Sequence, residues 1–212
     1  EIYFLAENPF ALIDCNPVDV IHDLNFYSCD GKHLCSNKYK TNEYNSEIKL
    51  PNLSLTDSYC SFTHNVTPEL NLKKNNLSYQ HRGYTIYKNK KNCLGSFLHG
   101  NFGSIQDNSL YKTAAKKRSK LFEYTPVYEF DNQNKYHIVF NNPTNKPIKI
   151  ELRENQNSNQ VSDKKIIPSF GCRFFEIENY TGSLTFISYL PICRANIFKN
   201  PSQISNFDVF HS

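Results

Sequence analysis

Residues Tyr136–Leu152 read YHIVFNNPTNKPIKIEL, with apolar side chains at every second position on both sides of a central polar segment. A period of two residues is that of a β-strand with one buried face. The central segment, 141–147, is rich in asparagine, proline and threonine, which favour turns. The stretch therefore predicts a β-hairpin with strands at Tyr136–Phe140 and Ile148–Leu152.

The same pattern continues through the second half of the chain, where short apolar runs alternate with clusters of turn-forming residues. The runs are Tyr136–Phe140, Ile148–Leu152, Gln160–Ile167, Cys172–Ile177, Leu184–Tyr189, Arg194–Phe198 and Asn206–Phe210. Short strands at this regular spacing are typical of an antiparallel β-sandwich of immunoglobulin-like, Greek-key type.

The first half predicts two further hairpins. One has its tight turn at Asp30-Gly31, between Val20–Tyr27 and Lys32–Cys35. The other joins Gly83–Tyr87 to Cys93–His99. Weaker strand patterns occupy Glu47–Leu50 and Tyr59–His64, and the lead-in 1–14 is compatible with a short helix or a strand.

A basic stretch in mid-chain, with helix-forming composition but no apolar face, has the character of a linker. We therefore predict a first β-sandwich module at 1–106, a linker at 107–123 and a second module at 124–212. A weak similarity between Gly83–His99 and a second set of runs, Gly182–Ile187, Arg194–Phe198 and Phe210-His211, suggests an internal duplication, and chance likeness between strand hairpins is the rival explanation.

Composition limits the function. The chain has 212 residues, of which 39% are hydrophobic and 14% aromatic, so Phe and Tyr must supply much of the buried area and the chain is not disordered. A net charge of +4 is too small for a dedicated nucleic-acid binder, and the cluster Lys116–Lys120 has the character of a solvated linker. No apolar run is long enough to span a membrane, so the sequence predicts a soluble protein with no membrane span.

Seven cysteines are scattered along the chain without any Cys-x-x-Cys pair. An odd number leaves one over in any disulfide framework, and most lie in apolar contexts, where a thiol behaves as a small hydrophobic group. We expect mostly reduced thiols and a cytoplasmic or otherwise reducing compartment. The cluster of Cys29, His33 and Cys35 around a turn superficially suggests soft-metal ligands, but structural zinc sites need four ligands, so we interpret it as a hairpin with incidental thiols.

Common catalytic signatures are missing from the sequence, including the phosphate-binding loop, the dinucleotide fingerprint, the nucleophile elbow and the zinc-protease helix motif. Histidines recur at predicted strand ends, at His64, His99 and His211. If these ends meet at one edge of a sandwich, they form a three-histidine site for zinc or another divalent transition metal, which activates water. The simpler interpretation is that such histidines close the rim of the core.

The expected function is that of a non-catalytic binding or accessory module of a larger protein or assembly, with no cofactor and with carbohydrate or a protein as partner. Tyr84, Tyr87 and Asn101 are the candidate ligand-binding residues, because tyrosine rings form stacking surfaces for sugars. A metal-dependent enzyme built on the three histidines is the alternative.

Overall fold

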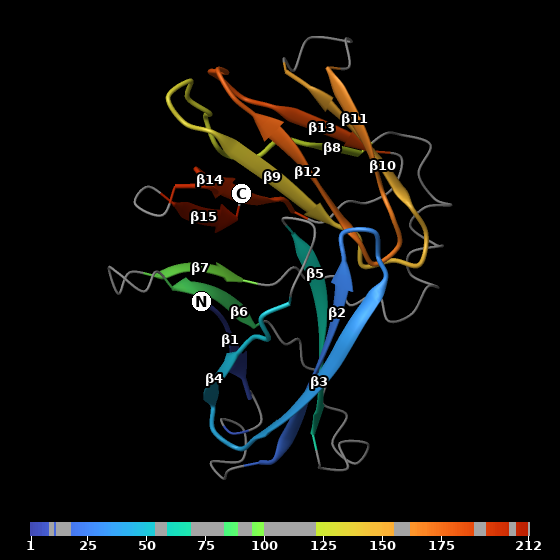
Figure 1. The fold of residues 1–212 in the computed structure, drawn as a ribbon, viewed down its shortest axis with the longest axis vertical. Helices are drawn as coiled ribbons and strands as arrows, with labels where there is room; N and C mark the ends of the chain where they lie inside the picture. Colours follow the sequence, from blue (N-terminus) through green and yellow to red (C-terminus); the bar gives the residue numbers. More distant parts are fainter. Residues whose placement is uncertain are drawn as a thin grey trace. The chain divides into compact units, whose positions relative to one another are not determined.

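The computed structural model describes residues 1–8, 11, 18–53, 59–68, 83–88, 95–99, 122–154, 162–188, 194–203 and 207–211, with the backbone alone at 68, 95, 97, 99 and 211. Over these residues the protein is built of β-strands with almost no helix, and the strands form four small antiparallel sheets (Figure 1). The all-β prediction is confirmed. No helix in the described ranges is long and apolar enough to cross a membrane.

The chain divides into two compact units. Unit 1 consists of Glu1–Phe26, His33–Ser54 and Phe62–Asn101, and unit 2 of Tyr27–Lys32, Leu55–Ser61 and Phe102–Ser212. The division at 1–106, 107–123 and 124–212 stays a prediction. Of its linker the structure describes only Phe122 and Glu123, which begin a strand.

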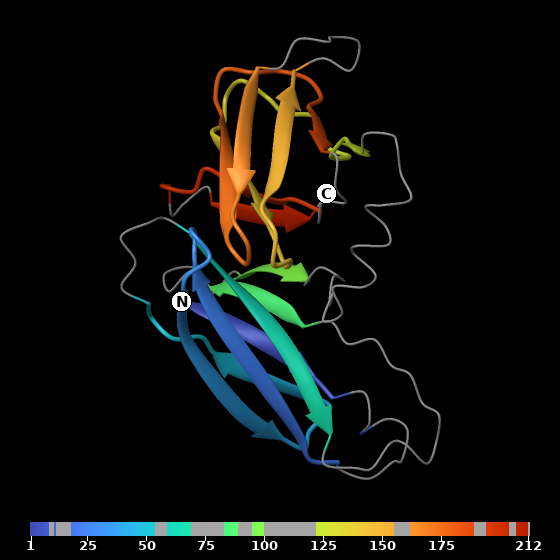
Figure 2. The same ribbon diagram turned by 90° about the vertical axis from the view of Figure 1, so that its right-hand side faces the viewer.

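Unit 1 contains two sheets. The first has the order β4-β1-β6-β7, formed by Asn45–Lys49, Ile2–Glu7, Tyr84–Lys88 and Gly95–His99. The second has the order β3-β2-β5, formed by His33–Thr41, Val20–Ser28 and Cys60–Pro68, which lie side by side in Figure 2. Both predicted hairpins of this half are confirmed, since β2 neighbours β3 and β6 pairs with β7.

The core of unit 1 lies between its two sheets. Phe4 and Ala6 from β1 and Ile48 from β4 meet Leu24 and Phe26 from β2, and all five are at most 6% exposed. Alternation along β1 therefore sends Phe4 and Ala6 into the core, while Tyr3 and Leu5 lie on the opposite face of the same sheet.

Unit 2 contains two sheets as well, each of four strands, and they share one core. Their orders are β11-β10-β13-β8 and β12-β9-β14-β15. The bounds are Phe122–Tyr124 (β8), Tyr136–Asn141 (β9), Ile148–Arg153 (β10), Asp163–Ile167 (β11), Cys172–Ile177 (β12), Thr185–Ser188 (β13), Asn196–Lys199 (β14) and Asp208–His211 (β15). A strand lies within or across each of the seven predicted runs. Side chains of both sheets, such as Phe140 and Phe186, join a single buried cluster.

The predicted hairpin at Tyr136–Leu152 is wrong. Its two strands exist, but β9 pairs with β12 and β14, whereas β10 pairs with β11 and β13 in the other sheet. The connection between them crosses from one sheet to the other. Each strand still buries one face against the common core, so its alternation is the same as in a hairpin and does not reveal the partner.

Asn142 holds this crossing connection in place. Its side-chain amide donates to the carbonyl oxygens of Lys146 (2.7 Å), Ile167 (3.2 Å) and Pro168 (3.0 Å), and its Oδ1 accepts from the backbone and hydroxyl of Thr144. Asn142 and Thr144 are 1% and 2% exposed. A buried carbonyl oxygen that lacks a hydrogen-bond donor lowers the stability of the fold. The Asn142 side chain supplies donors that the paired backbone of a hairpin would otherwise provide.

The suggested internal repeat is not reproduced in the strand pairing. In the first copy β6 and β7 pair directly. In the second copy β13 pairs with β10 and β8, and β14 pairs with β9 and β15, so the two strands belong to different sheets.

Candidate functional site

The structure places the three predicted metal-ligating histidines on three strands of two units. His64 lies on β5 and His99 on β7, both in unit 1, while His211 lies on β15 in unit 2. The side chains of His99 and His211 are outside the described part. Within that part, no group of three or more His, Cys, Asp or Glu side chains is placed to hold a metal ion. The three-histidine site therefore stays a prediction.

His64 instead belongs to a partly buried polar chain that the sequence analysis missed. Nε2 of His64 lies 3.0 Å from Nδ1 of His22, and Nε2 of His22 lies 2.9 Å from Oγ1 of Thr41. The two imidazoles are stacked with centroids 5.2 Å apart, and Phe4 meets His64 edge-on at 4.6 Å. The available signal was the alternation of β2, which places His22 on the same face as Val20 and Leu24.

Burial determines the protonation of His22. Its side chain is 0% exposed, and this burial lowers the pKa of its imidazole from 6.5 to about 4, so His22 is neutral near pH 7. A neutral imidazole has one ring nitrogen that donates and one that accepts. His22 can therefore serve both of its contacts, to His64 and to Thr41, without carrying a buried charge.

We expect unit 1 to lose stability on acidification. The folded pKa of His22 lies below its unfolded value, so the stabilisation is full above about pH 6.5 and is lost as the pH falls toward 4. The loss should reach roughly 2–3 kcal/mol. Hydrogen exchange of the β2 and β5 amides between pH 7 and 4, corrected for the intrinsic exchange rate, measures it.

His22→Gln should flatten this profile, because glutamine keeps a donor and an acceptor but does not titrate. His33→Gln is the matched control, since His33 is exposed and contacts Ser36 at 2.8 Å on the surface. An unchanged acid profile in His22→Gln, with the fold intact, would contradict the assignment.

The predicted ligand-binding tyrosines do not share a face. Tyr84 and Tyr87 are three residues apart on β6, so alternation directs them to opposite faces of the sheet. Tyr84 pairs with Leu5, on the face opposite to the core side chain Phe4. Tyr87 pairs with Ile2, which is on the Phe4 face. Asn101 lies outside the described residues.

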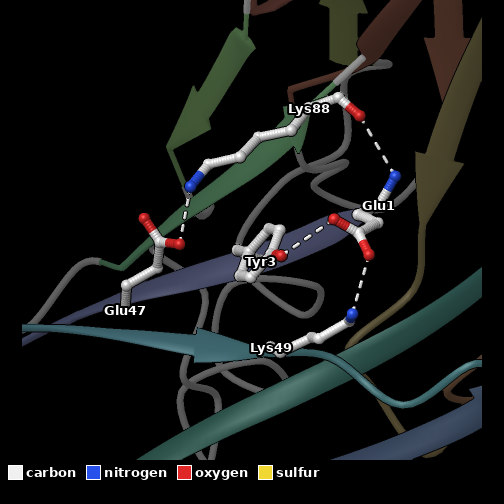
Figure 3. Close-up of polar contacts among 5 residues, drawn as sticks. All are labelled: Glu1, Tyr3, Glu47, Lys49 and Lys88. Atoms are coloured by element: carbon white, nitrogen blue, oxygen red, sulfur yellow. Dashed lines mark hydrogen bonds and ion pairs between the residues drawn. The ribbon is translucent and has the colours of Figure 1, made fainter. Parts of the chain in front are cut away.

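The face that carries Tyr84 also carries a ladder of charged side chains, which we call the ladder face: Glu1, Tyr3, Glu47, Lys49, Lys88 and Tyr84. Figure 3 shows the first five. The hydroxyl of Tyr3 donates to Oε2 of Glu1 at 3.0 Å, and Nζ of Lys49 donates to Oε1 of Glu1 at 2.8 Å. Nζ of Lys88 donates to Oε1 of Glu47 at 2.6 Å. Three strands, β1, β4 and β6, thus contribute to one polar network.

The ring of Tyr3 lies beside both ammonium groups of the ladder. Nζ of Lys88 is 4.3 Å and Nζ of Lys49 is 5.9 Å from its centroid, within range of a cation–π attraction. The hydrogen bond to Glu1 raises the pKa of the Tyr3 hydroxyl, and the same carboxylate raises the pKa of Lys49. Tyr3 therefore stays a neutral donor, and Lys49 stays charged.

Unit 2 has a second polar chain, on the face of β12-β9-β14-β15 that points away from the core. The phenol of Tyr59 lies 2.8 Å from Nδ1 of His137, whose Nε2 lies 3.2 Å from Glu176. His137 stacks on Phe174 at 4.4 Å, and Tyr59 also packs against Phe198. Burial lowers the pKa of His137, and Glu176 partly opposes that shift. Because the ring of Tyr59 packs against Phe174 and Phe198, we assign this chain a structural role on the sheet.

The cysteine cluster around the first turn has the character of a hairpin with incidental thiols. His33 hydrogen-bonds to Ser36, and Cys35 packs against the core of unit 1. The carbonyl oxygen of Cys29 accepts from the backbone of Cys172 at 3.0 Å in unit 2. The basic residues Lys116–Lys120 lie outside the described part of the chain.

Comparison with known proteins adds no assignment to this geometry. The chain matches no family model, no curated protein and no solved structure.

Proposed function

We propose that this chain is a non-catalytic binding or accessory module of a larger protein or assembly, and that it recognises carbohydrate through the ladder face of unit 1. Binding of a protein partner at the same face is the rival outcome. The finer architecture that we propose is a pair of immunoglobulin-like, Greek-key sandwiches. In unit 2 this is supported by β9 and β12 pairing in one sheet while β10 and β13 pair in the other.

The observation that carries the proposal is the concentration of hydrogen-bonding groups beside an aromatic side chain on one sheet face. The side chains of Lys49, Lys88 and Glu47 are 61%, 40% and 42% exposed. Isolated surface ion pairs contribute about 0–1 kcal/mol to stability, so the ladder is not explained by the stability it provides. Donors and acceptors held in fixed positions are what a ligand with many hydroxyl groups requires.

Tyr84 supplies the ring of the proposed site. Its partner in the register is Leu5, which also pairs with Glu47, so Tyr84 lies in the row of Glu47. The partner of Tyr3 is Ile86, a buried residue, so Tyr84 is diagonal to Tyr3 on the neighbouring strand. Residues in such a diagonal relation have Cβ atoms roughly 7–8 Å apart. The ring of Tyr3 has the ammonium of Lys88 beside it, and we assign it the role of positioning that lysine.

Tyr84→Ala is expected to reduce carbohydrate binding by about 3- to 10-fold, since a well-placed aromatic contact contributes roughly 0.5–1.5 kcal/mol beyond the area that it buries. Affinity electrophoresis against immobilised soluble polysaccharides, followed by titration of the retained one, measures the change. Tyr87→Ala is the matched control, because that side chain lies on the opposite face of the same strand.

Equal weakening by both substitutions would place the ligand elsewhere. Retention of no polysaccharide, together with a partner protein whose binding is lost in Tyr84→Ala, would support the rival outcome. Retention of neither would refute a binding role for this face.

A further inference from the structure

We infer that the ladder face takes an uncharged sugar chain and discriminates against acidic ones such as uronic-acid or sulfated polysaccharides. This inference rests on the proposed function and narrows its ligand class. It follows from how the charges of the ladder are paired.

Each positive side chain of the ladder has a carboxylate of its own. Lys49 contacts Glu1 at 2.8 Å and Lys88 contacts Glu47 at 2.6 Å, so these four side chains sum to zero. Alternation along β1 adds the carboxylate of Glu7 to the face, and the ammonium of Glu1, which donates to the carbonyl oxygen of Lys88 at 3.1 Å, offsets it. The lysine nearest to the tyrosine ring, Lys88, is also held there by its cation–π contact at 4.3 Å. No side chain of the ladder carries a charge that an ionic ligand would balance.

The pairs nevertheless leave hydrogen-bonding capacity toward solvent. An ammonium group has three protons and a carboxylate about four acceptor positions. Lys49, Lys88 and Glu47 each use one of these in the ladder, and all three side chains are at least 40% exposed. Sugar hydroxyls, which both donate and accept, can replace water at these positions while both ion pairs stay intact.

An acidic ligand would bind to the same face less favourably. To reach either ammonium it must come close to the carboxylate that is already bound there, and like charges repel at short range. Binding then requires an ion pair of the ladder to break, and this cost offsets the gain from the new one. The neutral ligand has no such cost, so its binding should also depend little on salt.

Glu47→Gln tests the inference in the intact chain. Glutamine keeps the shape and an acceptor but leaves Lys88 without its counter-charge. For the wild-type chain we expect a neutral polysaccharide to be retained with less than about 2-fold change between 50 and 500 mM salt, and a uronic-acid polysaccharide to be retained weakly. Glu47→Gln should keep neutral binding within about 2-fold and increase acidic binding by about 5-fold or more at low salt.

Glu151→Gln is the matched control, because it removes the carboxylate from a comparable exposed pair with Lys149 on β10 of unit 2. This variant should bind both polysaccharides as the wild type does. Wild-type retention of the acidic chain alone, with steep salt dependence, would overturn the inference while leaving the proposed function standing. Retention of neither chain would overturn the proposed function itself and the inference with it.

Discussion

Asn142→Asp is expected to lower the free energy of unfolding of unit 2 by roughly 3–5 kcal/mol, the cost of an uncompensated charge in a buried position. The wild-type amide points its two N–H groups at three carbonyl oxygens, those of Lys146, Ile167 and Pro168. A carboxylate of the same shape presents only acceptors to these oxygens. Urea denaturation followed by hydrogen exchange of the β9 and β10 amides measures the loss.

The variant should show a characteristic pH dependence. Burial among carbonyl oxygens raises the pKa of the new carboxyl group in the folded state, so the deficit shrinks as the pH falls and grows as the pH rises through that value. Asn145→Asp is the matched control, because residue 145 is exposed in the same connection. If both substitutions had the same small effect, the role given to Asn142 would be wrong.

Gly31→Ala is expected to destabilise unit 2 by roughly 2–4 kcal/mol, combining backbone strain with a steric clash. Gly31 has a φ of +79°, in the left-handed region. A Cβ at this position would lie 1.8 Å from the carbonyl oxygen of Ser169, an atom of the backbone that cannot rotate away. The turn Tyr27–Lys32 would then have to withdraw from its partners in unit 2.

The turn Tyr27–Lys32 makes several contacts in unit 2 that this withdrawal would break. The ring of Tyr27 stacks on Phe170 with centroids 5.3 Å apart, and the guanidinium of Arg173 donates to the carbonyl oxygen of Cys29 at 2.7 Å and pairs with Asp30. Hydrogen exchange of the β12 amides, compared between wild type and variant, reports on this packing.

Gly182→Ala separates strain from clash. Gly182 also has a positive φ, +125°, but its Cβ would meet only the side chain of Tyr180, at an ordinary 3.5 Å. We expect a smaller loss of about 1–2 kcal/mol in this variant. Equal losses of stability in the two variants would show that the close contact with Ser169 does not contribute to the effect of Gly31→Ala.

The existence of strands was predictable because it depends on local alternation. Residues Tyr136, Ile138 and Phe140 all face the core, as their period-two spacing indicated. Turn chemistry was equally informative at Gly31, where the Asp-Gly signal marks the turn between β2 and β3. These signals come from neighbouring residues and need no knowledge of distant ones.

The candidate sites were less predictable, because they combine residues far apart in the chain. His64 was recognised, but its partner His22 lies 42 positions earlier in the chain. Only the alternation of β2, which places His22 on the buried face of that strand, distinguishes it from an ordinary surface residue. Tyr84 was recognised, but its charged neighbours come from Glu1, Glu47 and Lys49 on other strands, which only the register brings together.

The sequence by itself determined that this protein is all-β, where most of its strands lie and which side chains are buried in its regularly alternating strands, such as β10, since a period of two residues follows from the backbone alone. In unit 2, the tertiary structure alone decided which strands pair. Alternation is identical for a hairpin and for a connection that crosses between sheets. β9 and β10 lie in different sheets that bury one core, and Asn142 satisfies the carbonyl oxygens at the crossing between them. The tertiary structure also decided which segments make up unit 2. This unit includes Tyr27–Lys32 and Leu55–Ser61 from the first half of the chain. Contacts such as that between Tyr59 and His137 hold them there, and no local sequence pattern encodes such contacts.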